Sequence, residues 1–255
     1  MQTRISVVVP AFNEERYLPR LLDSIDAARI RHPGGAAAVE VIVADNGSTD
    51  ATARIAAARG CHTVAVRPRR IGAVRNAGAR AARGRILAFV DADMQVHPET
   101  FRAIEAHFGR GRDAVAITGA LPERRSPGID AAWWLLGACT ALAGYGMPLA
   151  FHECMPSGVV CCRREDWAAV GGYCEKRLFA EDLRFLLDLQ DLARRRGERA
   201  GWIAGVPAVC STRKFDAHGD WHYLEMAAML PLLAFLDRGA LRRFARRYWY
   251  GAQRY

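Results

Sequence analysis

The chain has 255 residues, of which 51% are apolar and 25% charged, and its formal net charge is +9. This composition excludes an intrinsically disordered chain, and the length suffices for one large α/β domain or two small ones. Only Lys176 and Lys214 among the 36 basic residues are lysines, so almost all of the positive charge is on arginine. Guanidinium groups suit phosphate, which indicates an anionic partner: a nucleic acid, a membrane surface or a phosphate-bearing substrate.

The cysteines and the N-terminal segment indicate a reducing, cytoplasmic environment. The chain has seven cysteines, two of them adjacent at positions 161 and 162, and no C-x-x-C spacing. This is typical neither of a disulfide framework nor of a zinc ribbon. The apolar run near the N-terminus is interrupted by Asn13 and Glu14 and is too short for the apolar region of a signal peptide. We therefore expect a cytoplasmic protein.

Short β-branched runs alternate with helical patterns over the first half of the chain. The expected strands are 5–9, 39–43, 63–66, 86–90 and 114–118, and the expected helices are 17–25, 50–59, 71–82 and 98–108. Strands separated by helices of this length predict a parallel α/β sheet, in which ligands bind beyond the carboxyl ends of the strands. Polar residues such as Asn13, Asp45 and Asp91 follow three of these strands.

The second half is less regular. It predicts strands at 154–161 and 202–209, a helix at 181–195 and a basic helical end over 221–255. Between the two halves, residues 131–151 contain no charge over 21 positions, a length that reaches a membrane span. Glycines at 137, 144 and 146 and a proline at 148 weaken this segment as a straight helix.

The sharpest chemical signal is the sequence ILAFVDAD, which ends at Asp93. In an extended chain, Asp91 and Asp93 point the same way, so both carboxylates can face one site. Two oxygen ligands with room for water and phosphate oxygens suit Mg²⁺ or Mn²⁺ bound to a diphosphate. The alternative is a pair of solvated loop acids before the helix that begins near Pro98.

Two further motifs are ambiguous when taken singly. The string DNGSTD from Asp45 to Asp50 is either a turn with a helix cap or a pocket in which Asp45 accepts a hydrogen bond from a nucleobase. The string RIGAVRN places Arg75 near a helix start, where it either meets phosphate or base or belongs to a solvated face.

Taken in order, VVVPAFNEE, VADNGSTD and GAVRNAGARAARGRILAFVDAD resemble the nucleotide-sugar-binding half of family 2 glycosyltransferases over residues 3–120. MPSGVVCCRREDWAAVGGYCE, LFAEDLRF and, more loosely, CSTRKFDAHGDW extend the resemblance to about residue 222. It implies the GT-A fold: an α/β, Rossmann-like, mixed and mostly parallel sheet flanked by helices, with a C-terminal helical extension. The implied domain is 1–220, with a donor half (1–120) and an acceptor half (121–220), and a basic amphipathic helical tail (221–255) follows it.

The resemblance also implies a role for each matching residue. The nucleotide-sugar donor, with UDP favoured, would contact Pro10, Phe12, Asn13, Glu14, Asp45, Gly72, Arg75, Asp91, Ala92, Asp93, Arg213 and Lys214. Asp45 would read the base, and Arg213 with Lys214 would clamp the diphosphate. Asp93 would hold Mn²⁺ or Mg²⁺, with Asp91 touching the ribose or sharing the ion and His218 as a further candidate ligand.

On the acceptor side, the resemblance makes Asp182 the general base and Glu181 an assisting carboxylate. Single displacement then inverts the anomeric centre. Without the family pattern, both acids read as an ordinary acidic first helical turn. The expected acceptor region includes Trp133, Trp134, His152 and Glu153.

Two segments suggest contact with a membrane surface and a lipid acceptor. Residues 131–151 are either a buried helix or an apolar acceptor surface. In the C-terminal segment, apolar residues recur at helical spacing from Leu241 to Trp249, and 238–255 contain six arginines and no acidic residue. This pattern is typical of a helix on an anionic membrane or of one packed on the protein.

Three other functions compete with this interpretation. A haloacid-dehalogenase-type phosphatase would use Asp91 as nucleophile and Asp93 as acid, but some ninety residues of organised sequence precede the motif here. A nucleotidyltransferase would want a glycine-rich basic loop where this chain has AFNEE. A basic nucleic-acid-binding module has the charge but no motif, since the basic residues alternate with acids before the tail. Nucleic acid is therefore not expected as a partner.

Overall fold

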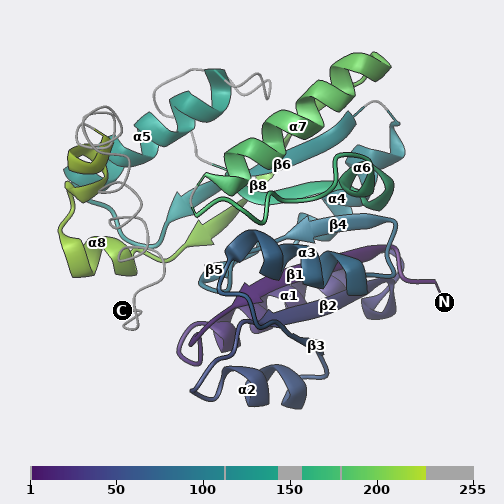
Figure 1. The fold of residues 1–255 in the computed structure, drawn as a ribbon, viewed down its shortest axis with the longest axis horizontal. Helices are drawn as coiled ribbons and strands as arrows, with labels where there is room; N and C mark the ends of the chain where they lie inside the picture. Colours follow the sequence, from purple (N-terminus) through teal and green to yellow (C-terminus); the bar gives the residue numbers. More distant parts are fainter. Residues whose placement is uncertain (1, 112, 143–156, 179, 228–255) are drawn as a thin grey trace.

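The computed structural model describes residues 2–111, 113–142, 157–178 and 180–227. They form an eight-stranded sheet with helices on both faces (Figure 1). The strands are β1 (Ile5–Ala11), β2 (Val39–Asp45), β3 (His62–Ala65), β4 (Ile86–Phe89), β5 (Met94–Gln95), β6 (Asp113–Pro122), β7 (Ser157–Arg163) and β8 (Arg199–Cys210). The helices are α1 (Leu18–Arg31), the 3₁₀ turn η1 (Ala36–Ala38), α2 (Thr52–Ala58), α3 (Ile71–Ala81), α4 (Thr100–Gly109), α5 (Pro127–Leu142), α6 (Arg164–Ala169), α7 (Glu181–Arg196) and α8 (Arg213–His218).

The strand order is β3-β2-β1-β4-β7-β6-β8-β5. Neighbours pair in parallel from β3 to β4 and between β6 and β8, whereas β7 is antiparallel to both β4 and β6 and β5 is antiparallel to β8. The expected mixed, mostly parallel sheet is thus confirmed. The carboxyl ends of β1, β2 and β4 share one edge of the sheet, where the polar motifs follow.

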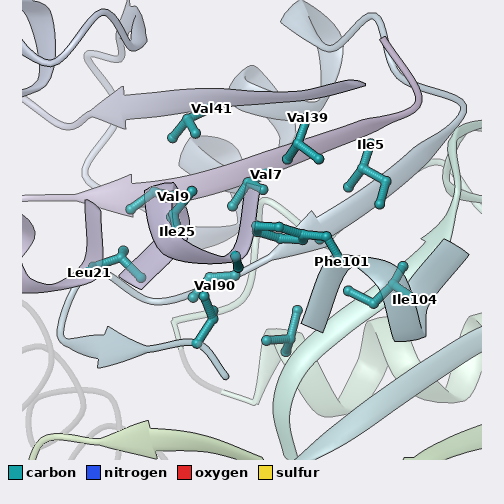
Figure 2. Close-up of a cluster of buried hydrophobic side chains, with 14 of the residues drawn as sticks. Ile5, Val7, Val9, Leu21, Ile25, Val39, Val41, Val90, Phe101 and Ile104 are labelled. Atoms are coloured by element: carbon teal, nitrogen blue, oxygen red, sulfur yellow. The ribbon is translucent and has the colours of Figure 1, made fainter. Parts of the chain in front are cut away.

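Alternating residues of the central strands build two cores. On one face, Ile5, Val7 and Val9 pack with Leu21 of α1 and Phe101 of α4 (Figure 2). On the other face, Val8 and Phe89 contact α3 and α7, with Phe185 at the centre. Successive strand residues point to opposite faces, so a near-continuous apolar strand is buried on both sides.

Several elements differ from the expected ones. Helix α5 occupies part of the uncharged 131–151 segment, and β6 runs on to Pro122, four residues past the expected end. The segment containing Arg213, for which no helix was expected, forms the short helix α8. Helix α2 begins at Thr52, and Asp50 accepts the Thr52 backbone N–H from just outside the helix. Most of the expected basic tail, 228–255, lies outside the described residues.

Candidate active site

The loop after β4 brings Asp91 and Asp93 to the polar edge of the sheet. The Val90 N–H still donates to Val8 O, and the Met94 N–H turns back onto Asp91 O. Strand β5 then pairs with the end of β8, and the Ser211 N–H donates to Asp93 O at 3.2 Å. These backbone bonds bring the start of α8 next to the two acids.

Arg75 joins the first of these acids to helix α7. Its Nη2 donates to Asp91 Oδ1 at 2.8 Å and its Nη1 donates to Glu181 Oε1 at 2.7 Å. The side chains of Arg75 and Glu181 are each 9% exposed, and the guanidinium lies 5.2 Å from the centre of the Tyr173 ring. Ion pairs in such a setting are strong because little water screens them.

The charges at this centre shift each other's pKa. Burial alone would lower the pKa of Arg75, but the negative groups around it, first among them Asp91, raise it above its ordinary value. Burial raises the pKa of Glu181, together with the charge of Asp182 and against the effect of Arg75. Arg75 therefore stays protonated, and the buried Glu181 is its ion-pair partner.

Arg213 holds the second acid. Its Nη1 and Nη2 donate to the two carboxylate oxygens of Glu14 at 2.7 and 2.8 Å, and Nη2 also lies 2.9 Å from Asp93 Oδ2. The guanidinium stands 4.6 Å from the centre of the Tyr17 ring. Burial lowers the pKa of Arg213, but the hydrogen bond to Glu14 and the charge of Asp93 outweigh it and raise the pKa.

Asp182 follows Glu181 in the first turn of α7, but its side chain is on the outside of the protein. It is exposed, and its Oδ1 accepts the Leu183 N–H at 2.7 Å. The preceding Ala180 has a left-handed backbone with φ +54°, and among the described residues only Asn13, at φ +53°, is another non-glycine with positive φ. Such strained residues gather at functional sites, where they aim neighbouring groups.

The loops after β1 and β2 are locked together around Asp45. Ser48 N lies 3.3 Å from both Asp45 carboxylate oxygens, and Asn13 Oδ1 accepts the Thr49 N–H at 2.9 Å. Phe12 is buried, with the Arg69 guanidinium 3.9 Å from the centre of its ring. Ala11, which precedes Phe12, pairs with Asp45 in the sheet, so both residues lie at the edge where the nucleobase is expected.

Three of the residues expected to contact the nucleotide-sugar donor contribute to the structure through backbone pairing or packing. Pro10 pairs with Ala44 inside the sheet, and Ala92 is part of the core between the two acids. A Cβ on Gly72 would stand 3.0 Å from Cys174 O, so glycine lets α3 approach that segment closely. Lys214 lies half-buried in the first turn of α8.

The expected acceptor residues are described only in part. The Trp133 indole N–H donates to Ala120 O at 2.8 Å, and its ring packs on Phe215. Trp134 packs with Ala138 and Trp202. His152 and Glu153 lie outside the described residues. Within the described part of α5, the tryptophans are thus packed against the body of the protein.

The residues present fit a divalent cation that shares its shell with a ligand. Asp91 and Asp93 offer carboxylate oxygens two residues apart, and their side chains are 41% and 20% exposed. No group of three or more His, Cys, Asp or Glu able to hold a metal occurs in the described residues, so His218 is not gathered with the two acids. Mg²⁺-type ions need only one or two protein carboxylates when substrate phosphates supply the rest.

Sequence reasoning gave no role to Asn76, Tyr173 or Tyr17. Asn76 is 2% exposed, donates to Tyr173 O and accepts the Tyr173 N–H, both within 2.9 Å, and so fixes the ring beneath Arg75. The signal was a polar residue directly after Arg75 in a helix otherwise rich in alanine and glycine. Tyr17 gave no comparable signal, because its partner Arg213 is distant in the sequence.

In the described part of the chain, no helix has both the length and the apolar character needed to cross a membrane.

The comparisons with known proteins agree with this architecture. An uncharacterized glycosyltransferase of Mycobacterium tuberculosis is 34% identical over 167 residues, which are 63% of this chain and 68% of that protein. Undecaprenyl-phosphate 4-deoxy-4-formamido-L-arabinose transferase of Pseudomonas paraeruginosa is 38% identical over 136 residues, 51% of this chain but only 38% of that one. The crystal structure of glucosyl-3-phosphoglycerate synthase from M. tuberculosis, in complex with Mn²⁺, uridine diphosphate and glucosyl-3-phosphoglycerate, superposes with a TM-score of 0.56 at 25% identity, covering 91% of this chain and 79% of that one.

The family model described as glycosyl transferase family 2 matches residues 6–134, about half of the chain. That match includes β1, β2 and the two acids after β4, and the structural neighbour shares the GT-A fold. The chain therefore belongs to glycosyl transferase family 2 and is a glycosyltransferase.

Proposed function

We propose that the protein is a metal-dependent, inverting glycosyltransferase that moves a sugar from a UDP-sugar to a lipid-linked phosphate or hydroxyl acceptor. The observation that carries the proposal is the Arg75 bridge. It joins Asp91, at the donor edge of the sheet, to Glu181, directly before Asp182 on α7. A donor and an acceptor bound on either side of this bridge would meet in one site.

Asp93, with Asp91 beside it, would hold Mn²⁺ or Mg²⁺. The ion, when bound, offsets the negative charge of the departing nucleoside diphosphate. The related synthase, which crystallised with Mn²⁺ and uridine diphosphate, supports both a divalent metal ion and uracil as the nucleobase of the donor. Asp45 and Phe12, which lie at the polar ends of the neighbouring strands β2 and β1, support the same orientation of the donor.

Asp182 and Glu181 have different roles in this proposal. Glu181 is buried and ion-paired to Arg75, so it orients that cation and does not reach an acceptor. Asp182 is exposed and is the group that takes the proton from an acceptor hydroxyl. The acceptor oxygen then attacks the sugar from the face opposite the diphosphate, which inverts the configuration.

The acceptor is proposed to be a polyprenyl phosphate at the inner face of the membrane. Three relatives of Pseudomonas and Klebsiella are named as undecaprenyl-phosphate transferases. Leu183 and Leu187 are exposed on α7 within two turns of Asp182, and Leu136 is exposed on α5. The exposed leucines on α7 belong to the helix that carries Asp182, and exposed apolar side chains there suit a hydrocarbon chain. The segments 131–151 and 238–255 are proposed to add membrane contact.

A thermal-shift screen tests this function. We expect uridine diphosphate to raise the melting temperature with Mn²⁺ and not without it, because only the metal complex neutralises the diphosphate. At a hundred times the dissociation constant, the added stability is about 2.7 kcal/mol. Hydrolysis of a generic phosphomonoester without nucleotide binding would instead support the phosphatase alternative.

A further inference from the structure

The pair formed by Glu14 and Arg213 joins segments 199 residues apart in the sequence. Both carboxylate oxygens of Glu14 accept from the guanidinium, and the side chains of Glu14 and Arg213 are 2% and 10% exposed. A two-bond pair of this kind fixes the plane of the guanidinium as well as its position. Buried in this way, Arg213 has one defined orientation.

Glu14 is placed to hold Arg213 rather than a nucleotide. Its backbone N–H donates to Thr52 Oγ1 at 2.7 Å, which ties the loop after β1 to α2. Its side chain is almost wholly covered, and both oxygens point at Arg213. A bound nucleoside would need an exposed oxygen on this residue, and the burial leaves almost none.

Arg213, held in this orientation, also contacts Asp93, the proposed metal-binding acid. Its Nη2 lies 2.9 Å from Asp93 Oδ2, and the Tyr17 ring covers its face. The Glu14 pair uses two of the five guanidinium N–H groups, so donors remain for a phosphate oxygen. The same cation can therefore contact Asp93 and a diphosphate next to it.

We propose that Glu14 is a positioning residue, which sets Arg213 against Asp93 and thereby fixes the diphosphate end of the donor site. The inference rests on the proposed donor site. Without the Glu14 carboxylate, Arg213 is a buried cation that turns toward Asp93 and competes with the metal. The affinity for the donor and the activation of the enzyme by Mn²⁺ then fall together, whereas the transfer of the acceptor proton to Asp182 does not change.

The test measures Mn²⁺-dependent binding of uridine diphosphate by calorimetry, together with donor KM and kcat. Glu14→Gln keeps the shape and removes the charge, and we expect a tenfold or greater loss of affinity and a matching rise in KM with kcat within about threefold. Glu40→Gln is the matched control. Glu40 is also buried and pairs with an arginine, Arg83, but it lies at the opposite end of β2, about 16 Å along the strand from Asp45.

A double-mutant cycle separates positioning from direct contact. If Glu14 acts through Arg213, the Glu14→Gln/Arg213→Gln double variant binds no worse than Arg213→Gln alone. Additive losses overturn the proposal, because Glu14 would then contact the donor itself. Equal losses in Glu14→Gln and Glu40→Gln overturn it too, since they would indicate general destabilisation.

Glu14→Asp covers the case in which Glu14→Gln does not fold. It keeps the charge but shortens the side chain, and we expect an intermediate loss of affinity that shows the same non-additivity with Arg213→Gln. If wild-type protein binds no nucleoside diphosphate with Mn²⁺, the proposed function fails. If wild-type and Glu14→Asp bind equally well, only this inference fails.

Discussion

Arg75 and Arg213 each bind one carboxylate of the pair after β4, but they tie it to different parts of the chain. Arg75 connects Asp91 to Glu181 at the start of α7, on the proposed acceptor side. Arg213 connects Asp93 to Glu14 in the loop after β1, on the proposed donor side. The two neighbouring acids are thus ion-paired to different parts of the chain. Each arginine can therefore be tested for a separate contribution to stability, binding and catalysis.

Replacing Arg75 should have the largest effect. Arg75→Gln leaves Glu181 buried without its cation, and breaking such a buried pair costs about 3–5 kcal/mol of unfolding free energy. Transfer activity should be lost as well, because Asp91 and α7 lose their common partner. Urea unfolding and a transfer assay measure both. The control is Arg80→Gln on the same helix, whose pair with Glu175 is exposed and should contribute less than about 1 kcal/mol. Similar losses in the two variants would contradict a special role for Arg75.

Asp182→Asn should reduce kcat by roughly 10²–10⁴-fold with a hydroxyl acceptor. Stability should change by no more than about 0.5 kcal/mol, since the residue is exposed. A phosphate acceptor, whose second pKa is about 6, is already anionic at neutral pH and should show a smaller loss. Glu165→Gln, an exposed acid in the first turn of α6, is the control. Full activity of Asp182→Asn with both acceptors would exclude it as the base.

Arg213→Lys should have a smaller effect, confined to the donor. Lysine keeps the charge but cannot donate two parallel hydrogen bonds to Glu14, so we expect about tenfold weaker binding of uridine diphosphate, or about 1.4 kcal/mol. Arg124→Lys provides the comparison, because Arg124 pairs with Asp216 and Asp220 at the surface. A fall in kcat without a change in donor KM would contradict the assignment of Arg213 to the donor side.

The smallest effect on the free energy of unfolding is expected at the surface pair of Arg124 and Asp220, and this effect should depend on pH. Hydrogen bonds from Arg124 lower the pKa of Asp220 from 3.8 to about 2. Because the folded-state pKa is the lower one, the contribution to stability is present above about pH 4 and is lost as the pH falls toward 2. Urea unfolding of wild type and Asp220→Asn should therefore differ at pH 5 and converge near pH 2. A difference that grows on acidification would contradict this sign.

Most strands and helices of residues 1–120 were predictable because each carries a local signal. The apolar run before Asp91 and the turn residues after Asp45 place those acids at strand ends with an error of one or two residues. Helix α5 was only one of two alternatives for the apolar segment 131–151, because the helix is apolar on all sides and has no amphipathic period. The two-residue strand β5 depends on its pairing with β8, and the short helix α8 packs through Phe215 on Ile129 and Ala132 of α5.

The site itself depends on contacts that no local pattern encodes. Arg75 was ambiguous between a phosphate ligand and a solvated residue, and only the fold brings Glu181 to it across 106 positions. Arg213 was predicted as a diphosphate clamp, and its pairing with Glu14 could not be predicted from spacing. The family resemblance proposed roles for these residues, whereas their partners in space required the three-dimensional structure.

The central claim is that donor binding and proton transfer belong to separate sides of one site. Calorimetric titration of uridine diphosphate with Mn²⁺ into wild type, Asp93→Asn and Asp182→Asn tests it most directly. We predict that wild type and Asp182→Asn bind with similar affinity, and that Asp93→Asn loses binding by tenfold or more. Equal binding by Asp93→Asn and wild type would contradict the claim.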